Sequence, residues 1–489
     1  MKRLIWLLRR IFVSLLIIVI GVGAVKTLRL TSRQIISDAV TPIPIDDSAV
    51  ARFSEFIKIP TFSKEGELDS LTFKKLATLL KRNYPLTDSL LESIPAPPLS
   101  LIYKWPGRNS ELLPVLLLGH TDIVTISEKT KKDWQFPPLS GAVQDGFILG
   151  RGTLDDKIAV IAAFEAVEML LKEGFTPNRT IYFAFGHDEE IGGGNGAKKI
   201  AAQFEKAGLT FEYVMDEGMI VLENALPGID QPVGLIGIGE KGYASFQIEV
   251  KLKEGGHSSM PPDETAIGVL SEAILKLREN PFPARIDGAV QELFDYAAPE
   301  MSLPFKILFA NRWLTNGLLL RQLSGSPASN AMIRTTVAPT MIEGGFQENV
   351  LPSQVSATVN LRILPGETTE TVKKHMEEVI DDNRITISKI GEFTKDPSFV
   401  SPTSSFGFQT IQKTILEVFP NVIVAPSLVV AGTDSRHYKN VSKNIYRFLP
   451  VKLNKSDLGR IHGINERISV ENYQQAIRFY RRLMVNSTK

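Results

Sequence analysis

Three consecutive acidic residues, Asp188, Glu189 and Glu190, end an apolar run and are followed almost at once by the glycines 192–194. Adjacent carboxylates repel one another, so a chain that places them at the mouth of a core strand usually has a cation there to offset the cost. The chain contains no cysteine, so any such metal must be held by histidine and carboxylate side chains. This stretch therefore predicts part of a metal site.

Other segments also place potential metal ligands directly after an apolar run. These ligands are His120 with Asp122, Asp155 with Asp156, Asp216 with Glu217, and His462 near the C-terminus. Ligands in open α/β sheets collect at the carboxyl ends of strands, because side chains from several loops converge there. A lone acidic pair is usually a solvated feature, but the joint pattern predicts one site built from several strand ends.

The His-x-Asp pair at 120–122 has a simple physical rationale. Residues i and i+2 of a strand point to the same face, so Asp122 can lie beside His120 and fix its tautomer. Two imidazoles with several carboxylates and no sulfur suit Zn²⁺, with Co²⁺ or Mn²⁺ as alternatives. One carboxylate bridging two such ions would make a paired site with an activated shared water, and an uncoordinated glutamate could take its proton.

The elements that must position these residues read as an α/β sheet. The segments 113–120, 179–190 and 211–218 are largely apolar before their polar ends, as strands covered on both faces are. Between the first two, residues 155–174 carry apolar side chains at helical spacing and stop at Gly174. Strand, helix and strand in this order imply a sheet with helices on both sides.

The pattern changes near Gly239. Residues 243–253, 332–345 and 354–366 alternate like half-exposed strands, and residues 263–280 read as a helix. We therefore expect a smaller α+β domain at 240–368, inserted between the two parts of a catalytic domain at 46–239 and 369–489. Residues from about 280 to 328 read as extra helices within this insert.

The N-terminal segment, residues 1–30, is a candidate membrane anchor. Its uncharged core, Ile11 to Val25, has four basic residues before it and Lys26 after it. This core is short for a helix that needs about 20 residues to span, although long basic side chains can snorkel. We expect an uncleaved anchor with the body exported to the periplasm, a lumen or the outside; a cleaved signal peptide cut near Gly23 and a merely buried helix are the alternatives.

Composition limits the classes of partner. Lys plus Arg total 55 against 54 Asp plus Glu, so the charge balance offers no polyanion-binding surface, and nucleic acid is not an expected partner. With 43% hydrophobic and 22% charged residues the chain is globular, and its length suits about three domains.

Seven motifs together resemble the M20 metallopeptidase and amidohydrolase family, in particular its branch of carboxypeptidase S, aminoacylase-1 and N-fatty-acyl-amino-acid synthase/hydrolase. They occur in the family's order and cover nearly all of the chain beyond the N-terminal segment. The motifs are GHTDIV (119–124), GRGTLDDK (150–157), FGHDEEIGG (185–193), MDEG (215–218), GGHSSMP (255–261), GTDSRHY (432–438) and RIHGINE (460–466).

The resemblance implies two zinc ions and a role for each matching residue. His120 would bind one zinc with support from Asp122, and Asp155 would bridge both ions through a segment whose Asp155–Asp156 peptide is typically cis in the family. Glu189 would be the general base. Glu190 and His462 would bind the second zinc, and the remaining ligand is Asp216 or Glu217, since relatives use either acid at this point.

The resemblance also implies that the insert is a lid or dimerisation domain. His257 would reach the zinc site from it and stabilise the oxyanion, and in many relatives this histidine comes from a second subunit. The extra helices could alter that arrangement, so a homodimer is left open. Arg436 matches the position where relatives hold a substrate carboxylate, and Asn330 and Arg362 are further candidates for substrate contact.

We therefore expect a membrane-anchored zinc hydrolase that cleaves an amide bond next to an amino acid with a free carboxylate, by attack of a metal-bridging water activated by Glu189. The substrate would be a small peptide or an N-acyl amino acid. An aminopeptidase or dipeptidase on the same scaffold is the alternative, followed by a non-enzymatic binding protein that retains the fold. The apolar helices near 305–320 would suit a fatty acyl chain, although core packing is the preferred interpretation.

Overall fold

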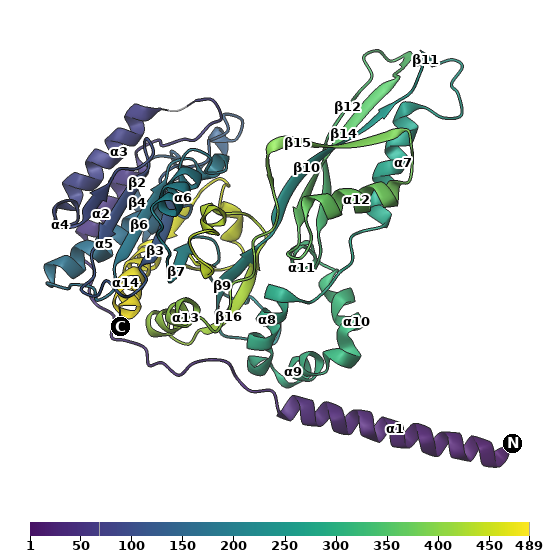
Figure 1. Cartoon of the computed structure of the whole chain (residues 1–489), viewed down its shortest axis with the longest axis horizontal. Coiled ribbons are helices and arrows are strands. Elements are labelled where there is room, and N and C mark those ends of the chain that lie inside the picture. Colours follow the sequence, from purple (N-terminus) through teal and green to yellow (C-terminus); the bar gives the residue numbers. More distant parts are fainter. Residues whose placement is uncertain (68, 489) are drawn as a thin grey trace.

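A ten-stranded sheet forms the centre of the larger domain in the computed structural model, which describes residues 1–67 and 69–488 (Figure 1). Its strands follow the order β1-β2-β6-β3-β7-β17-β9-β8-β18, and β16 pairs with β9. Their bounds are β1 Glu92–Ile94, β2 Leu101–Trp105, β3 Val115–His120, β6 Ile181–Gly186, β7 Tyr213–Asp216, β8 Val221–Leu222, β9 Val233–Glu240, β16 Ile423–Val429, β17 Ile445–Arg447 and β18 Lys452–Leu453. Strands β6, β3, β7 and β17 are parallel neighbours, so the α/β fold predicted from the sequence is confirmed.

Both faces of this sheet are covered, which explains the continuous apolar runs of its central strands. Leu116 and Leu118 of β3 lie in a buried cluster with α6, whereas Val115 and Leu117 lie in a second cluster with α5 and α14. Successive side chains of one strand therefore enter two different cores. The helices of this domain are α2 Ser48–Ile57, α3 Ser70–Asn83, α4 Pro85–Leu90, α5 Lys157–Lys172, α6 Ala197–Lys206, α13 Phe406–Val418 and α14 Val470–Ser487.

The inserted domain contains a four-stranded antiparallel sheet in the order β12-β14-β10-β15 (Figure 1). Every second side chain of β10 and β14 is buried in a cluster with α7 and α12, as the alternating pattern predicts. A short two-stranded antiparallel sheet of β11 and β13 lies at the far tip of this domain (Figure 1). The bounds are β10 Gly242–Lys251, β11 Gly256–His257, β12 Thr336–Gly344, β13 Val350–Leu351, β14 Gln354–Ile363, β15 Ile385–Lys395, α7 Ala266–Glu279 and α12 Thr369–Ile380.

The end of this insert differs from the boundary at 368 expected from the sequence. Val372 and Met376 of α12 lie in the core of the inserted domain, and β15 pairs with β10 up to Lys395. The sheet of the insert therefore runs on to Lys395. Helical periodicity identifies α12 but does not reveal which of two sheets its apolar face covers.

The extra helices of the insert pack on the larger domain instead of the inserted sheet. Helix α8 lies against β16, and its residues Val290, Leu293 and Phe294 join the core of the larger domain. These helices lie within the inserted segment of the chain, as expected. They pack on the larger domain, however, so the expectation that they belong to the inserted domain is wrong. Their bounds are α8 Gly288–Ala297, α9 Leu303–Ala310, α10 Arg312–Leu323 and α11 Pro327–Ile333.

The N-terminal helix α1, Lys2–Leu28, extends away from the rest of the molecule (Figure 1). None of its residues is buried, and it is long and apolar enough to cross a membrane, so the merely buried helix is excluded. The following residues run along the edge of the larger domain. There the side-chain amide of Gln34 donates to the Val424 carbonyl at 2.8 Å and accepts the Val424 N–H at 2.9 Å, which satisfies the open edge of β16.

Candidate metal centre and active site

Several of the site residues lie at the carboxyl ends of three neighbouring parallel strands of the central sheet. β3 ends at His120, β7 ends at Asp216, and β6 leads into the short 3₁₀ helix η2, Glu189–Ile191. In the strand register His120 lies opposite Gly186, the last residue of β6. The carboxyl ends of these strands therefore meet, as expected for ligand sites in open α/β sheets.

Asp155 lies between two imidazoles. Its Oδ1 is 2.9 Å from His120 Nε2, and its Oδ2 is 2.8 Å from His462 Nε2. The peptide that joins it to Asp156 is cis, as the sequence resemblance implies. Burial would raise the pKa of Asp155, but hydrogen bonds with both histidines hold it well below its usual range. The two carboxylate oxygens of Asp155 thus face two different imidazoles, an arrangement that suits a bridging ligand.

Asp122 supports both sides of this centre. His120 Nδ1 lies 3.1 Å from the Asp122 carbonyl oxygen and 3.3 Å from its Oδ1. The same carboxylate accepts the backbone N–H groups of Glu189 at 3.2 Å and Glu190 at 3.1 Å. Asp122 is fully buried, so these contacts are shielded from water. One side chain thereby orients the imidazole and the loop that carries the two glutamates.

Glu190 and His462 complete a donor set that fits a divalent cation. His120, Asp155 and Glu190 offer ligand atoms within 4.8 Å of one another, and His462 Nε2 lies 3.2 Å from Glu190 Oε2. Within the described residues, the buried Glu190 Oε1 has no hydrogen-bond partner. A buried carboxylate oxygen without a partner is costly unless a cation binds it. Nitrogen and oxygen donors without sulfur suit a divalent metal ion.

Asp216 and Glu217 have different surroundings. Asp216 Oδ1 accepts the Glu217 N–H at 3.0 Å, and its Oδ2 accepts the Ser435 N–H at 2.7 Å. Burial raises the pKa of Glu217 well above its ordinary value, and the nearby carboxylates of Asp155 and Asp216 raise it further. Both oxygens of Asp216 are therefore engaged by the backbone, whereas Glu217 lies among carboxylates that repel it.

Glu189 stands beside the metal centre next to a guanidinium group. Its Oε1 is 3.4 Å from Arg436 Nη2, and its side chain is 12% exposed. Burial raises the pKa of Glu189 to about 8, despite the opposing effects of His120 and Arg436. A carboxylate whose pKa lies near neutral pH can both accept and return a proton, as a general base requires.

Three cations lie near one another on the side of Glu189 that faces Arg436. Arg436 belongs to the 3₁₀ helix η4, Asp434–Tyr438, while Arg362 and Lys395 come from β14 and β15 of the inserted domain. Arg362 packs over the Tyr243 ring at 4.8 Å, and its pKa is lowered by burial and by the charge of Arg436. Burial and Arg436 also lower the pKa of Lys395, to about 8. We call Arg362, Lys395 and Arg436 the cationic group.

Two residues of this region were not singled out from the sequence. Lys395 ends an alternating strand and belongs to no motif, so no sequence signal identifies it. Asp434 lies inside the motif GTDSRHY, where only Arg436 had received a role. Its carboxylate is buried, neither oxygen has a hydrogen-bond partner within the described residues, and its Oδ1 lies so close to Gly193 that a Cβ there would approach to 2.1 Å. Gly193, at φ +66°, thus permits both the turn and the close approach.

The structure does not bring His257 into the site of the same chain. His257 lies on β11 at the far tip of the inserted domain, where its Nδ1 contacts Ser259 Oγ at 2.8 Å (Figure 1). Asn330 lies on α11, and no described side-chain hydrogen bond joins it to the site residues. Of the predicted substrate contacts, Arg436 and Arg362 lie near each other: burial lowers the pKa of Arg362, and the charge of Arg436 lowers it further.

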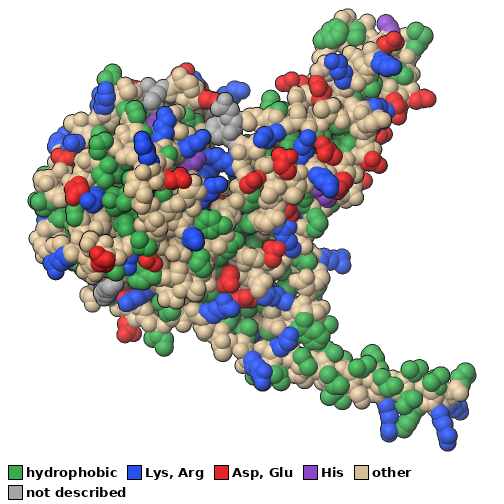
Figure 2. Space-filling view, in the orientation of Figure 1, with side chains coloured by type: hydrophobic (Ala, Val, Ile, Leu, Met, Phe, Trp, Pro, Cys, Tyr) green, Lys and Arg blue, Asp and Glu red, His purple; other side chains and the backbone are tan. Residues whose placement is uncertain are grey.

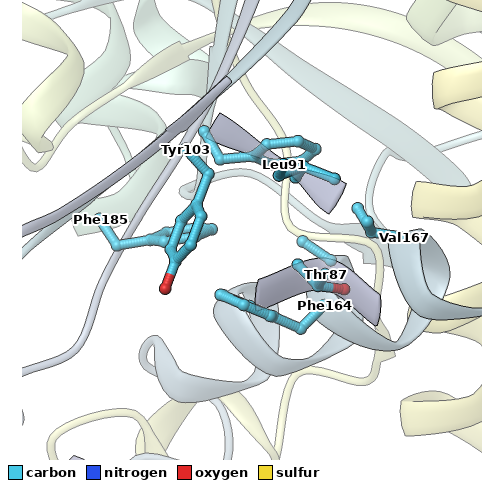
Figure 3. Close-up of a pocket in the computed structure, with 8 residues that line it drawn as sticks. Thr87, Leu91, Tyr103, Phe164, Val167 and Phe185 are labelled. Atoms are coloured by element: carbon cyan, nitrogen blue, oxygen red, sulfur yellow. The ribbon is translucent and has the colours of Figure 1, made fainter. Parts of the chain in front are cut away.

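A small cavity inside the larger domain is separate from this site. It has a volume of about 10 Å³ and lies between α4, α5 and the sheet, where Tyr103, Phe164 and Phe185 line it (Figure 3). That volume is about one water molecule in apolar surroundings. The cavity is a packing defect of the core and does not admit a substrate.

The sequence pattern of peptidase family M20/M25/M40 matches residues 116–486. A probable carboxypeptidase S-like protein of Dictyostelium discoideum is 41% identical over 99% of this chain and 95% of its own length. An N-fatty-acyl-amino acid synthase/hydrolase of Xenopus tropicalis is 40% identical over 88% of this chain and 84% of its own. The fold is similar to that of an M20 family metallo-carboxypeptidase from Sulfolobus solfataricus, with a TM-score of 0.65, 18% identity, and coverage of 90% and 99% of the two chains.

Proposed function

This chain belongs to peptidase family M20/M25/M40 and is an enzyme of that family, and we propose that it hydrolyses an amide bond whose amine side is an amino acid with a free carboxylate. Peptides with a free C-terminus and N-acyl amino acids both satisfy this description. One of the two relatives above is named as a probable carboxypeptidase S-like protein, and the other as an N-fatty-acyl-amino acid synthase/hydrolase. Each name corresponds to one of these two kinds of substrate. The proposal therefore defines the amino-acid side of the substrate.

The observation that carries this proposal is the cationic group beside Glu189. Among the described ion pairs, Arg362 and Lys395 have no acidic partner, and the Arg436 Nη2 contact with Glu189 is long at 3.4 Å. Half-buried cations that are not paired one-to-one with carboxylates favour an anionic ligand. A substrate carboxylate held by the cationic group would place the adjacent amide bond over Glu189 and the metal centre.

His120, Asp155, Glu190 and His462 would hold two divalent cations, with Asp155 between them and Glu217 as the remaining ligand in preference to Asp216. Two Zn²⁺ ions are our first choice, and Co²⁺ or Mn²⁺ are alternatives. Ions at this position lower the pKa of a shared water and polarise the scissile carbonyl. Asp122 supports this arrangement because it orients His120 and the backbone of Glu190.

Glu189 is the proposed general base. Its carboxylate would take a proton from the attacking water and return it to the nitrogen of the leaving amino acid. The low solvent access of the site keeps the pKa of this group near neutral pH, so both transfers are accessible at one pH. The Arg436 guanidinium lies next to Glu189 Oε1. The proposed general base is therefore adjacent to the group proposed to bind the substrate carboxylate.

His257 is the proposed oxyanion contact, supplied by a second copy of the chain through the inserted domain. Its place at the tip of that domain argues against a role in its own site. The neighbouring strand β12 is an edge strand on which Met341 and Ile342 are 58% and 69% exposed. An open edge with apolar side chains is suited to pairing with another copy.

The N-terminal helix is the proposed membrane anchor, with the catalytic body on the exported side. Its leading basic residues, including Lys2 and Arg3, favour the cytosolic side for that end. The length and exposure of α1 support this, and a cleaved signal peptide is the alternative that N-terminal sequencing of the mature protein tests.

The test uses the purified full chain in detergent with four substrates. A blocked dipeptide with a free C-terminus and a long-chain N-acyl amino acid should both be cleaved at the amide bond. Comparing the two rates of hydrolysis identifies which acyl group the enzyme prefers. The same blocked dipeptide with an amidated C-terminus should not be cleaved. Hydrolysis of a dipeptide amide with a free amine, without hydrolysis of the first two substrates, would instead establish an aminopeptidase.

A further inference from the structure

Helices α9 and α10 expose a row of large apolar side chains. These are Leu303 (63% exposed), Ile307 (47%), Trp313 (50%), Leu314 (61%) and Leu318 (58%). The pairs 303 and 307, and 314 and 318, are four residues apart, so each pair shares one helix face. We call these five residues the apolar face of α9 and α10. A soluble surface rarely leaves such a face open unless it binds an apolar partner.

This face is continuous with the N-terminal helix. Helices α1 and α9 pack together, and Asn311 Nδ2 donates to Thr27 Oγ1 at 3.1 Å and to the Gly23 carbonyl at 3.3 Å (Figure 1). Gly23 lies inside the uncharged run of α1, which ends at Val25. The end of α9 therefore meets α1 within its apolar part, not beyond it. Figure 2 shows apolar side chains along the length of α1, leading to this junction.

The side chains at this junction are those that favour a membrane–water boundary. Lys26 Nζ lies 5.4 Å from the centre of the Trp313 ring, and at the opposite end of α1 the Arg10 guanidinium lies 3.6 Å from the Trp6 ring. Tryptophan and basic residues collect at bilayer interfaces. From Arg10 to Lys26 the helix rises about 24 Å, which approaches the thickness of the hydrocarbon layer of about 30 Å.

The chain that follows α1 contacts the larger domain within six residues of the end of that helix. Arg33 Nη1 lies 3.1 Å from Glu292 Oε2 of α8, and the paired contacts of Gln34 with Val424 follow directly. These contacts lie five and six residues after the end of α1 at Leu28. A bilayer that α1 crosses therefore lies next to the side of the molecule that carries α9 and α10.

We infer that the apolar face of α9 and α10 inserts into the interfacial layer of the bilayer, on the side of the membrane that carries the catalytic body. The inference builds on the proposed anchor but is a separate claim, because α1 alone could tether a body that stands clear of the lipid. Leu303, Ile307, Leu314 and Leu318 would enter the upper acyl region, and Trp313 would lie at headgroup level.

The test exploits the absence of cysteine from the chain. Single variants Ile307→Cys and Leu314→Cys of the full chain are labelled with an environment-sensitive fluorophore and reconstituted in phosphatidylcholine vesicles, with or without doxyl groups on the acyl chains. Ile17→Cys in the middle of α1 is the positive control. Leu71→Cys, on α3 of the larger domain and 68% exposed, is the negative control.

We expect doxyl lipids to remove most of the emission of the probes at 307, 314 and 17 and to leave the probe at 71 unchanged. Quenching at 17 without quenching at 307 and 314 would overturn the docking and leave the anchor intact. Loss of quenching at 17 alone would contradict the anchor while the docking stands. Probes at 307 and 314 that are shielded from water yet insensitive to doxyl lipid would show that a second copy covers this face, which would also overturn the inference.

Discussion

The Asp122 carboxylate accepts the backbone N–H of Glu190 at 3.1 Å while the same side chain lies 3.3 Å from His120 Nδ1. Two candidate metal ligands that come from different strands are thus aligned by one buried acid. The relative position of a histidine on β3 and a glutamate after β6 is therefore set by a contact within the protein, before any metal binds.

Asp122→Asn should lower metal affinity or turnover by about 10- to 100-fold, the range found for outer contacts of metal ligands. The amide keeps the size of the side chain but loses the negative charge and one acceptor, so either His120 or the 189–190 backbone loses its partner. Metal content by elemental analysis, followed by turnover at saturating metal, separates the two effects.

Asp188→Asn is the matched control for that variant. The Asp188 carboxylate is also buried and also accepts two backbone N–H groups, those of Asn195 and Gly196 at 2.7 and 2.8 Å. It has no described contact with His120. An equal loss in both variants would mean that Asp122 acts only through loop stability.

Glu189→Gln should retain both metal ions and lose turnover by about 10²- to 10⁴-fold or more, because the amide cannot carry a proton between water and the leaving amine. Metal content and kcat are measured on the same sample. Near-normal turnover would remove the general-base assignment, and loss of metal together with activity would make Glu189 a ligand instead.

The cluster of candidate metal ligands could be predicted from the sequence because its members follow a local pattern. His120, the Asp188–Glu190 stretch and Asp216 each follow an apolar strand, and parallel strands bring such ends together wherever the fold is open α/β. The His-x-Asp spacing likewise follows from strand geometry alone. These positions do not depend on how the two domains sit relative to one another.

The part of the site that the inserted domain contributes depends on how the two domains are placed. Local sequence patterns do not predict that placement. Lys395 reaches the Glu189 region only because β15 pairs with β10 in the inserted sheet, whereas the sequence interpretation had ended the insert at 368. The position of His257 at the tip of β11 was equally inaccessible. The apolar sequence of α9 and α10 predicted helices, but it did not predict that nearly half of their large apolar side chains would face outward.

Glu217→Gln should reduce metal content from about two ions per chain to about one, because the uncharged amide is a weaker ligand. Asp216→Asn should keep the metal and mainly lower thermal stability, since its oxygens accept the N–H groups of Glu217 and Ser435. Elemental analysis and a melting curve on both variants decide between them. The opposite pattern would assign Asp216 as the ligand.

KM for substrates with a free carboxylate should rise as pH increases above about 8. Burial, followed by the charge of Arg436, lowers the pKa of Lys395 to about 8 in the free enzyme. A bound carboxylate favours the charged ammonium, so this contribution to binding is present below that pKa and is lost as pH rises through it. KM is measured between pH 6.5 and 10 with kcat recorded separately.

Two variants at Lys395 serve as the controls for that profile. Lys395→Arg keeps a charge at all these pH values and should flatten the rise in KM, whereas Lys395→Met should raise KM already at neutral pH. A native profile that survives in the Met variant would exclude Lys395 from carboxylate binding. An unchanged KM in Arg436→Met would exclude the neighbouring guanidinium in the same way.

His257→Ala and Glu189→Gln should each be nearly inactive alone and should recover activity when mixed. In a mixed dimer one site would combine the intact Glu189 of the first chain with the His257 supplied by the second, because β11 lies far from the site of its own chain (Figure 1). Random pairing makes half of the dimers mixed, and each mixed dimer has one complete site, so activity should approach a quarter of the native value. Activity is measured after co-incubation at a concentration where sedimentation shows dimers. No recovery in mixtures that do form mixed dimers would mean that His257 either acts within its own chain after closure of the inserted domain or has no catalytic role, and normal activity of His257→Ala alone would establish the second.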